Sequence, residues 1–436
     1  MTTTTLPPSQ TTETPEHEIS PSEISVGVVI GRTAEFFDFF VYSIASVIVF
    51  PSHVFPFVDP LTGTLLSFLV FALAFVARPL GTLLFSWIDG QYGRVTRLTI
   101  ALFGLGGATA AIALLPGYET VGMASVAILA SFRLAQGLAL GGTWDGLPSL
   151  LAMSAPPGRR GLYAMVPQLG APFGLIVAAA LFIYLLTSLS AQDFLAWGWR
   201  YPFFVALAIN VVALFARLRI VATPEYDLLF RSRELQPTPV LETIRAEGRN
   251  IVIGAFAPLA SFAMFHMVTV YPLSWIFLFT EADPARFLII TVIAALFGAV
   301  AVVVSGLLSD AFGRTAVLAW GAGMIGMFSL FAPVLLDGGG AGETVYMIAG
   351  FVILGLSFGQ ASGAVAANLA PGHRYTASAL TSDLAWLFGA GFAPAAALLL
   401  SSWAGLWTGG AYLLSGALAT LLALWLGRFR ADHWKA

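Results

Sequence analysis

The segments SWIDGQYGR (residues 86–94) and GLLSDAFGR (residues 306–314) decide how this chain folds, because they repeat one pattern in two places. Each follows a long apolar stretch, carries an aspartate and ends in Gly-Arg. Gly93 and Gly313 are 220 positions apart, and so are Arg94 and Arg314. We therefore predict two halves with the same order of elements.

The composition indicates a membrane protein. The 436 residues are 58% hydrophobic and only 10% charged, with a mean hydropathy of +0.87. Soluble domains carry roughly 25% charged residues. Because so little of the surface is suited to water, we expect most of it to face lipid.

The composition also argues against several functions. The chain has no cysteine, which rules out disulfides, thiol catalysis and cysteine-ligated metals. Its five histidines are too scattered to predict a metal site. It has no G-x-x-x-x-G-K nucleotide loop, no basic patch outside the apolar stretches and no catalytic cluster. We expect no enzyme activity, no cofactor and no nucleic-acid partner.

The apolar stretches predict twelve membrane spans. A helix needs about 20 apolar residues to cross a bilayer, and stretches of this length are too long for barrel strands. The predicted fold class is therefore an all-α membrane protein with two six-helix bundles. The spans are 24–50, 62–85, 98–115, 121–140, 162–186, 201–220, 251–280, 287–309, 316–336, 345–369, 377–402 and 411–427.

The polar intervals divide these spans six and six. We expect a disordered tail at 1–23, bundles at 24–220 and 250–427, a linker at 221–249 and a second tail at 428–436. Fifteen of the 20 Lys and Arg residues fall on the side that holds the linker and both tails. Because positive residues favour the cytoplasmic side, we predict a multi-pass protein of the cytoplasmic (inner) membrane with both termini in the cytoplasm.

Five motifs make the chain resemble one known group. GLLSDAFGR resembles the loop signature of the major facilitator superfamily. Four others resemble motifs of its metabolite:proton symporter family: RTAEFFDFFVY (32–42), RPLG (78–81), RLAQGLALGGTW (133–144) and WGWRYPFF (197–204). The resemblance implies the major facilitator fold and proton-coupled uptake of organic acids or compatible solutes. The sequence departs from the family pattern at Asp89-Gly90, Thr143, Asp145 and Ala222.

Three ionisable residues inside spans are candidates for proton coupling. Glu35 and Asp38 lie three positions apart and so share a helix face. Neighbouring carboxylates disfavour each other's ionisation, a property suited to taking and releasing a proton. Arg133 lies mid-span and is expected to hold a carboxylate or an anionic substrate. The competing interpretation of all three is a set of fixed structural ion pairs.

Other polar and aromatic residues in the spans are candidates for substrate binding. Arg78 is placed to bind a substrate carboxylate, to pair with Asp38 or to extend toward the membrane surface. For His266 the competing interpretation is a hydrogen-bonded histidine in the core. The full set is Arg78, Trp144, Asp145, His266, Tyr271, Asp383 and Trp386.

The loop segments provide the candidates for gating. Asp89, Arg94, Asp310 and Arg314 fall on the predicted cytoplasmic side of the two halves. Contacts there that break and re-form would shift the balance between inward-open and outward-open states.

We therefore predict a secondary active transporter, monomeric in the bilayer, that carries a small organic acid or zwitterionic metabolite together with a proton. Repeated halves around a midplane site are a recurrent transporter design. Two rival interpretations stay open: a proton-driven exporter of hydrophobic compounds, and a non-transporting sensor on the same fold.

Overall fold

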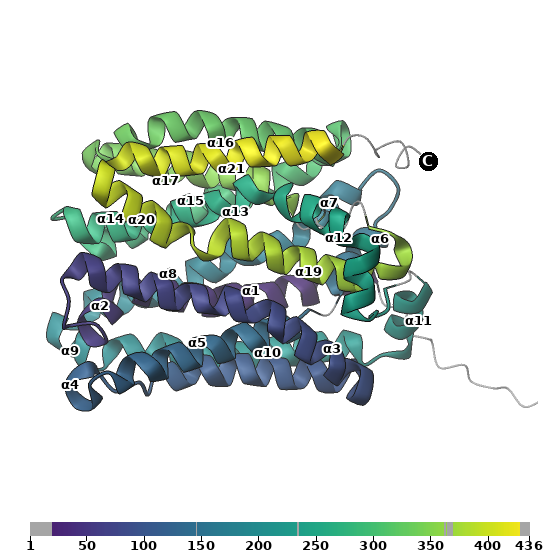
Figure 1. The fold of residues 1–436 in the computed structure, drawn as a ribbon, viewed down its shortest axis with the longest axis horizontal. Helices are drawn as coiled ribbons and strands as arrows, with labels where there is room; N and C mark the ends of the chain where they lie inside the picture. Colours follow the sequence, from purple (N-terminus) through teal and green to yellow (C-terminus); the bar gives the residue numbers. More distant parts are fainter. Residues whose placement is uncertain (1–19, 145, 233–234, 362, 364–368, 428–436) are drawn as a thin grey trace, which may run out of the picture.

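The computed structural model describes residues 20–427 except 145, 233–234, 362 and 364–368, and all the regular secondary structure in this part of the chain is helical (Figure 1). The predicted tails at 1–19 and 428–436, and Asp145, lie outside the described residues. The first-half helices are α1 (Pro21–Ile48), α2 (Phe50–His53), α3 (Pro60–Ile112), α4 (Tyr118–Val121), α5 (Ala124–Gly142), α6 (Leu147–Met153), α7 (Arg160–Met165), α8 (Gly170–Ser188), α9 (Ala191–Ala196) and α10 (Tyr201–Val221).

The second half follows two connecting helices, α11 (Pro224–Ser232) and α12 (Val240–Phe256), the second of which leads directly into the next membrane pass. The remaining helices are α13 (Leu259–Thr269), α14 (Tyr271–Phe279), α15 (Pro284–Phe312), α16 (Arg314–Leu336), α17 (Gly339–Phe358), α19 (Arg374–Trp386), α20 (Ala393–Ala404) and α21 (Leu406–Gly427).

The two repeated segments form the same turn. α3 has 53 residues, which at 1.5 Å per residue is about 80 Å, more than twice the thickness of a bilayer core. It bends at Gly93, where φ is 80° and ψ is 165°. Gly313 has nearly the same conformation between α15 and α16, with φ at 86° and ψ at 148°. Only glycine adopts this conformation without strain, so each segment connects two antiparallel passes.

The chain makes twelve passes. Ten described segments are long and apolar enough to span a membrane. The longest of them, α3, contributes two passes because of its bend. The 28-residue α1 adds one more, although its buried charges set it apart from the others. The predicted spans match these passes. α17 ends at Phe358, and residues 362 and 364–368 of the span predicted at 345–369 lie outside the described residues.

The two halves lie side by side (Figure 1). Within the first half α3 packs on α5, and α1 packs on α8 and α10; within the second α15 packs on α17, and α16 on α21. Across the halves α15 meets α7 and α8, α19 meets α3, and α1 meets α14. We call the end that holds residues 20 and 427 the terminal face; α6, α7 and α11 lie there.

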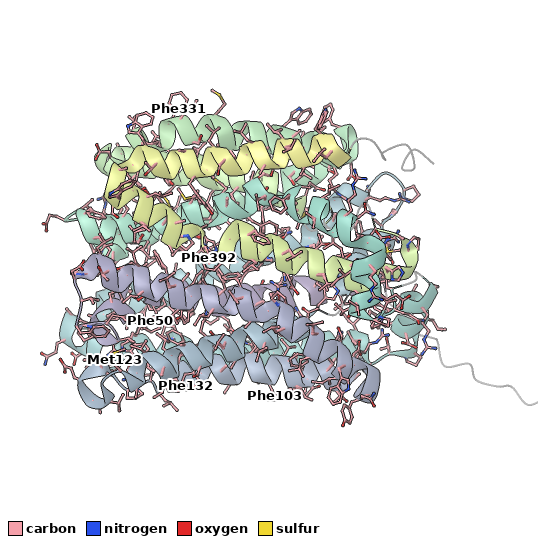
Figure 2. The ribbon with its side chains drawn as sticks, viewed as in Figure 1. Phe50, Phe103, Met123, Phe132, Phe331 and Phe392 are labelled. Atoms are coloured by element: carbon pink, nitrogen blue, oxygen red, sulfur yellow. The ribbon has the colours of Figure 1, made fainter. Side chains whose placement is uncertain are left out.

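The outer surface is apolar. Figure 2 shows large apolar side chains along it, among them Phe103, Met123 and Phe331, which are 51%, 59% and 58% exposed. Surfaces of soluble proteins do not carry apolar side chains over this extent. The outward faces of these helices therefore suit lipid.

Two passes of the second half are interrupted within the bundle. Val270 separates α13 from α14, with Pro272 in the first turn of α14. A π-helical turn, Leu387–Gly391, separates α19 from α20. Irregular backbone at membrane depth is tolerated where it is buried in protein or lines a cavity. His266 and Trp386 lie beside these two breaks.

Candidate functional site

A buried ion pair joins the two halves at the middle of the bundle. Arg78 is near the middle of the first pass of α3, and Asp383 is on α19 of the other half. Nε of Arg78 lies 2.7 Å from Oδ1 of Asp383. The hydroxyl of Thr82 donates to Oδ2 of Asp383 at 2.5 Å. The sequence had suggested a substrate carboxylate, Asp38 or the membrane surface for Arg78. In the structure Arg78 pairs instead with Asp383, a carboxylate of the opposite half.

An aromatic contact lies one helical turn from this ion pair. Phe75 precedes Arg78 by three residues, and Trp386 follows Asp383 by three, so each shares a helix face with its charged neighbour. The Phe75 and Trp386 rings stack with centroids 6.1 Å apart and planes at 19°. The same two helices are thus joined by one ionic and one aromatic contact.

His266 lies among these rings and is fully buried. Its ring stacks on Phe39 at 5.2 Å and meets Phe71, Phe75 and Phe265 edge-on at 5.5, 6.3 and 5.5 Å. Neither ring nitrogen has a hydrogen-bond partner. His266 is therefore a buried histidine, but it is not hydrogen-bonded as the competing interpretation required.

Among the described residues, Asp38 is bound only by neutral groups. Its Oδ2 accepts from Asn210 at 2.7 Å and from Thr109 at 3.2 Å, whereas its buried Oδ1 has no hydrogen-bond partner. Gln136 donates to the Thr109 hydroxyl at 2.7 Å and accepts from Arg133 at 3.1 Å. A chain of hydrogen bonds therefore connects Arg133 with Asp38 through two neutral side chains.

Arg133 is held by aromatic rings and a carbonyl. Its guanidinium lies 4.1 Å from the centroid of Tyr42 and 4.6 Å from that of Phe71, and Nε donates to the Phe71 carbonyl at 3.0 Å. Among the described residues, no carboxylate lies within ion-pair distance of it. Its charge is stabilised mainly by the faces of the rings.

Glu35 is a paired carboxylate, in contrast to Asp38. Arg32 donates to one of its oxygens and Arg217 to the other, each at 2.6 Å. Arg217 also donates to the backbone carbonyl of Thr143 at 3.1 Å. All these residues belong to the first half, so the contacts hold α1, α5 and α10 together. Glu35 and Asp38 share a helix, but the structure gives them different partners.

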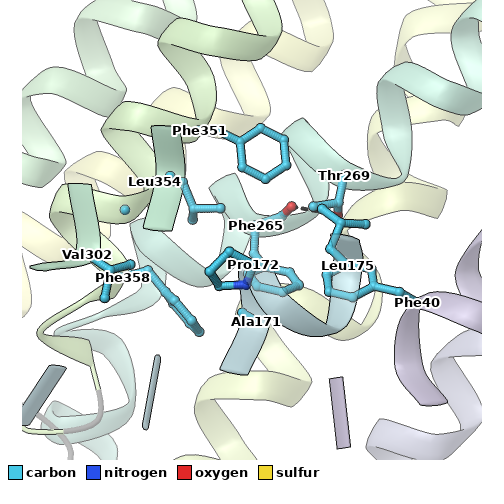
Figure 3. A pocket seen from close by; sticks show the side chains of 12 residues that line it. Phe40, Ala171, Pro172, Leu175, Phe265, Thr269, Val302, Phe351, Leu354 and Phe358 are labelled. Atoms are coloured by element: carbon cyan, nitrogen blue, oxygen red, sulfur yellow. Dashed lines mark hydrogen bonds between the residues drawn. The ribbon is translucent and has the colours of Figure 1, made fainter. Parts of the chain in front are cut away.

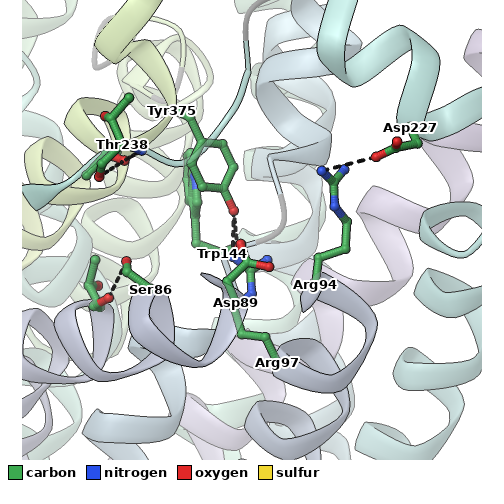
Figure 4. Close-up of polar contacts among 10 residues, drawn as sticks. Ser86, Asp89, Arg94, Arg97, Trp144, Asp227, Thr238 and Tyr375 are labelled. Atoms are coloured by element: carbon green, nitrogen blue, oxygen red, sulfur yellow. Dashed lines mark hydrogen bonds and ion pairs between the residues drawn. The ribbon is translucent and has the colours of Figure 1, made fainter. Parts of the chain in front are cut away.

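Several contacts join the halves at the terminal face (Figure 4). Arg97 donates to the hydroxyl of Tyr375 at 2.6 Å, and that hydroxyl donates to the Trp144 carbonyl at 3.0 Å. Asp89 accepts from Arg97 at 3.1 Å. Arg94 pairs with Asp227 of α11 at 3.3 Å. The altered order of Asp89 and Gly90 thus produces a contact within the first half that continues to Tyr375 of the second.

The second repeated segment makes its own contact between halves. Asp310 accepts from the backbone N–H groups of Gly161 and Leu162 at 2.5 and 3.1 Å. Arg314 donates to the carbonyl of Gly363 at 2.7 Å; within the described residues it contacts no carboxylate. Asp310 therefore makes the cross-interface contact considered for it, whereas Arg314 stays within its own half.

The remaining candidates are dispersed. Tyr271 shares a hydrogen bond of 2.8 Å with Ser401, within the second half. Trp144 lies in a cluster at the terminal face and not beside Trp386. Asp145 lies outside the described residues. The structure thus brings Arg78, Asp383, Trp386 and His266 together at mid-bundle and separates Trp144 and Tyr271 from them.

A mostly apolar pocket also lies between the halves (Figure 3). Its empty volume is about 320 Å³, including the open side, and Thr269 is the only lining residue with a polar side chain. Phe40 and Pro172 line it from the first half, and Phe265 and Phe358 from the second. None of the predicted site residues lines this pocket.

Sequence reasoning missed the partners of the buried charges. Thr82, Thr109, Arg217 and Tyr375 were not candidates. Asn210 was not one either, although it is the single amide in the apolar span 201–220, and that isolation is a usable signal.

Comparisons with known proteins agree with this fold. The family model described as "Sugar (and other) transporter" matches residues 24–261. The inner membrane metabolite transport protein YhjE of Escherichia coli (strain K12) is 36% identical over 425 residues, 94% of this chain and 96% of that protein. The shikimate transporter of the same strain is 28% identical over 411 residues, 91% and 92% of the two chains.

A solved structure extends the agreement to three dimensions. The major facilitator superfamily proton:xylose symporter XylE, bound to 6-bromo-6-deoxy-D-glucose, superposes with a TM-score of 0.70 at 20% identity, over 94% of this chain and 95% of that chain. The fold is thus that of the major facilitator superfamily, as the motifs predicted.

The chain belongs to the sugar (and other) transporter family. It is a secondary transporter of small organic molecules and not an enzyme.

The different partners of Glu35 and Asp38 generate a prediction. Replacing Glu35 by Gln removes the carboxylate that contacts both Arg32 and Arg217, and breaking a buried ion pair costs about 3–5 kcal/mol. Replacing Asp38 by Asn removes a charge that no cation contacts. We expect the thermal midpoint of purified E35Q to fall well below that of the wild type and that of D38N to stay close to it. Equal midpoints for the two variants would contradict these different roles.

Proposed function

We propose that this protein takes up a small organic acid or zwitterionic metabolite across the cytoplasmic membrane together with a proton, as a monomer with both termini in the cytoplasm. The observation that carries the proposal is the ion pair between Arg78 and Asp383, because it joins the two halves at mid-bundle. Rocking of one half against the other has to separate this pair.

A substrate carboxylate can take the place of Asp383. It offers Arg78 the same charged oxygens, and a guanidinium binds carboxylates strongly. A buried arginine left without a partner is costly, so the halves part most readily when a substrate anion binds Arg78. The similarity to a transporter named for shikimate, an organic acid, supports this substrate class.

Asp38 is the group that we assign to the proton. Two neutral donors hold one of its oxygens; within the described part of the chain no cation contacts it, and its other oxygen has no hydrogen-bond partner. Such a carboxyl can gain a proton without disrupting an ion pair. When it is charged, the hydrogen bonds through Thr109 and Gln136 transmit that charge to Arg133. Glu35, held by two arginines, has the fixed role in this assignment.

The terminal face is closed in this conformation. Asp310 and the contact of Arg97 with Tyr375 join the halves there. The bias of positive residues makes this face cytoplasmic. We infer that these contacts stabilise the state closed to the cytoplasm, and that breaking them shifts the balance toward the inward-open state.

One observation favours a second candidate, a proton-driven exporter of hydrophobic compounds. The pocket in Figure 3 lies between the halves and is lined almost entirely by apolar side chains. Such a cavity suits an apolar ligand. It gives no role to the Arg78 and Asp383 pair, however, whereas uptake of an anion does.

Replacing Arg78 by Ala separates the two candidates. We expect uptake of labelled organic acids into proteoliposomes to fall at least tenfold, because the anion loses its partner. Export of a hydrophobic dye should survive the change if the exporter interpretation is correct. The matched control is R78A combined with D383A, which leaves no unpaired charge: full recovery of acid uptake in the double variant would contradict a role of Arg78 in substrate binding.

Replacing Asp38 by Asn tests the proton assignment. In D38N we expect no accumulation of substrate under an inward proton gradient, because no carboxyl is left to carry the proton. Exchange of labelled for unlabelled substrate across the membrane should continue, since it needs no net proton movement. Accumulation that still follows the imposed gradient in D38N would show that the proton binds elsewhere.

A further inference from the structure

His266 combines complete burial with the absence of any hydrogen bond. Its exposed fraction is 0%, and both ring nitrogens lack a partner. Most buried side-chain polar groups are hydrogen-bonded, because leaving one unsatisfied destabilises the fold. A histidine that only filled the core would be replaced by an apolar residue without loss. A second conformation in which the imidazole gains a partner gives a reason for the residue.

The rings around His266 come from both halves. Phe39 is on α1, Phe71 and Phe75 are on α3, and Phe265 adjoins His266 on α13. We call these four side chains the aromatic box. Because three walls of the box belong to the first half and the imidazole to the second, parting the halves uncovers the imidazole. The partner that it gains is then a molecule in the transport path.

The charges around the aromatic box select the kind of partner. Aromatic rings alone would suit a quaternary ammonium group. The guanidinium of Arg133, however, lies 4.6 Å from the Phe71 ring, and no described carboxylate pairs with it. A second cation beside Phe71 would be repelled. Neutral imidazole offers one donor and one acceptor, which fits a hydroxyl group.

The position of Arg78 sets the size of the substrate. Phe75, a wall of the box, and Arg78 are three residues apart on α3, about 4.5 Å along the helix axis. The Phe75 ring lies 6.3 Å from that of His266. A carboxylate on Arg78 and a hydroxyl on His266 are therefore several carbons apart in one molecule.

We propose that His266 is the residue that determines specificity: it binds a hydroxyl group on the far side of a compact carboxylic acid whose carboxylate is on Arg78. The rings of the aromatic box enclose the carbon skeleton between these two groups. This inference rests on the proposed function, because it takes the acid at Arg78 as given. It adds that hydroxylated acids are preferred and that betaines are excluded.

The test compares two acids that differ in one hydroxyl. The probes are trans-4-hydroxycyclohexanecarboxylate and cyclohexanecarboxylate, with trimethylglycine as the quaternary ammonium probe. For wild-type protein in proteoliposomes we expect the hydroxy acid to have a KM at least tenfold lower than that of the deoxy acid, and trimethylglycine not to be transported. In H266F the KM ratio should approach one through a rise in the KM of the hydroxy acid alone.

One further variant and one further measurement guard against a purely structural effect. His266→Gln retains a donor and an acceptor, so we expect it to keep part of the preference that H266F loses. The thermal midpoint of H266F should equal or exceed that of the wild type, because the change removes an unsatisfied polar group. A fall in maximal rate for all probes with an unchanged KM ratio would assign His266 to structure alone and overturn the proposal.

The outcomes also separate this inference from the proposed function. Uptake of both acids with equal KM values, or transport of trimethylglycine in preference to them, would overturn the role of His266 and leave a carrier of acids or zwitterions standing. A failure of the wild type to move any of these probes or other small acids would contradict the proposed function, and the inference would fail with it.

Discussion

A charge buried away from water needs a partner, and this requirement determines how the helices of the protein meet. The described structure contains two kinds of partnership. Glu35 with its two arginines lies wholly within the first half, so these contacts persist when the halves move as rigid bodies. Arg78 and Asp383 come from opposite halves, so their contact has to break. These ion pairs are therefore of two kinds: one stays within a half, and the other, in our proposal, breaks when the halves part.

The two interruptions of the backbone in the second half lie next to candidate groups of the site. The interruption at Val270 follows His266 within one turn, and the π-helical turn begins directly after Trp386. Both interruptions are buried in protein, where irregular backbone is tolerated. Such π-helical turns are frequent at functional sites. Local irregularity therefore coincides with the groups to which we assign the substrate.

The sequence was sufficient to predict the passes, because length and hydropathy alone determine them. It also predicted the repeated turn, because Gly93 and Gly313 end the same pattern. It could not predict that Arg78 meets Asp383: the two are 305 positions apart, and their contact depends on how α3 packs on α19. Helical spacing put Glu35 beside Asp38, but it could not show that Glu35 meets two arginines whereas Asp38 meets an amide and a hydroxyl. Which side chain lies opposite is a property of packing that one sequence does not encode in its periodicity.

The central claim is that the two halves part only when the ion pair of Arg78 and Asp383 separates. The chain has no cysteine, so spin labels can be attached uniquely to cysteines introduced at Tyr92, beside the bend of α3, and at Phe312, the last residue of α15. These two side chains are 63% and 61% exposed. Distances between the labels, measured by pulsed electron paramagnetic resonance, should lengthen in D383N because the halves part. A distribution identical to that of the parent protein would show that the ion pair does not control the opening.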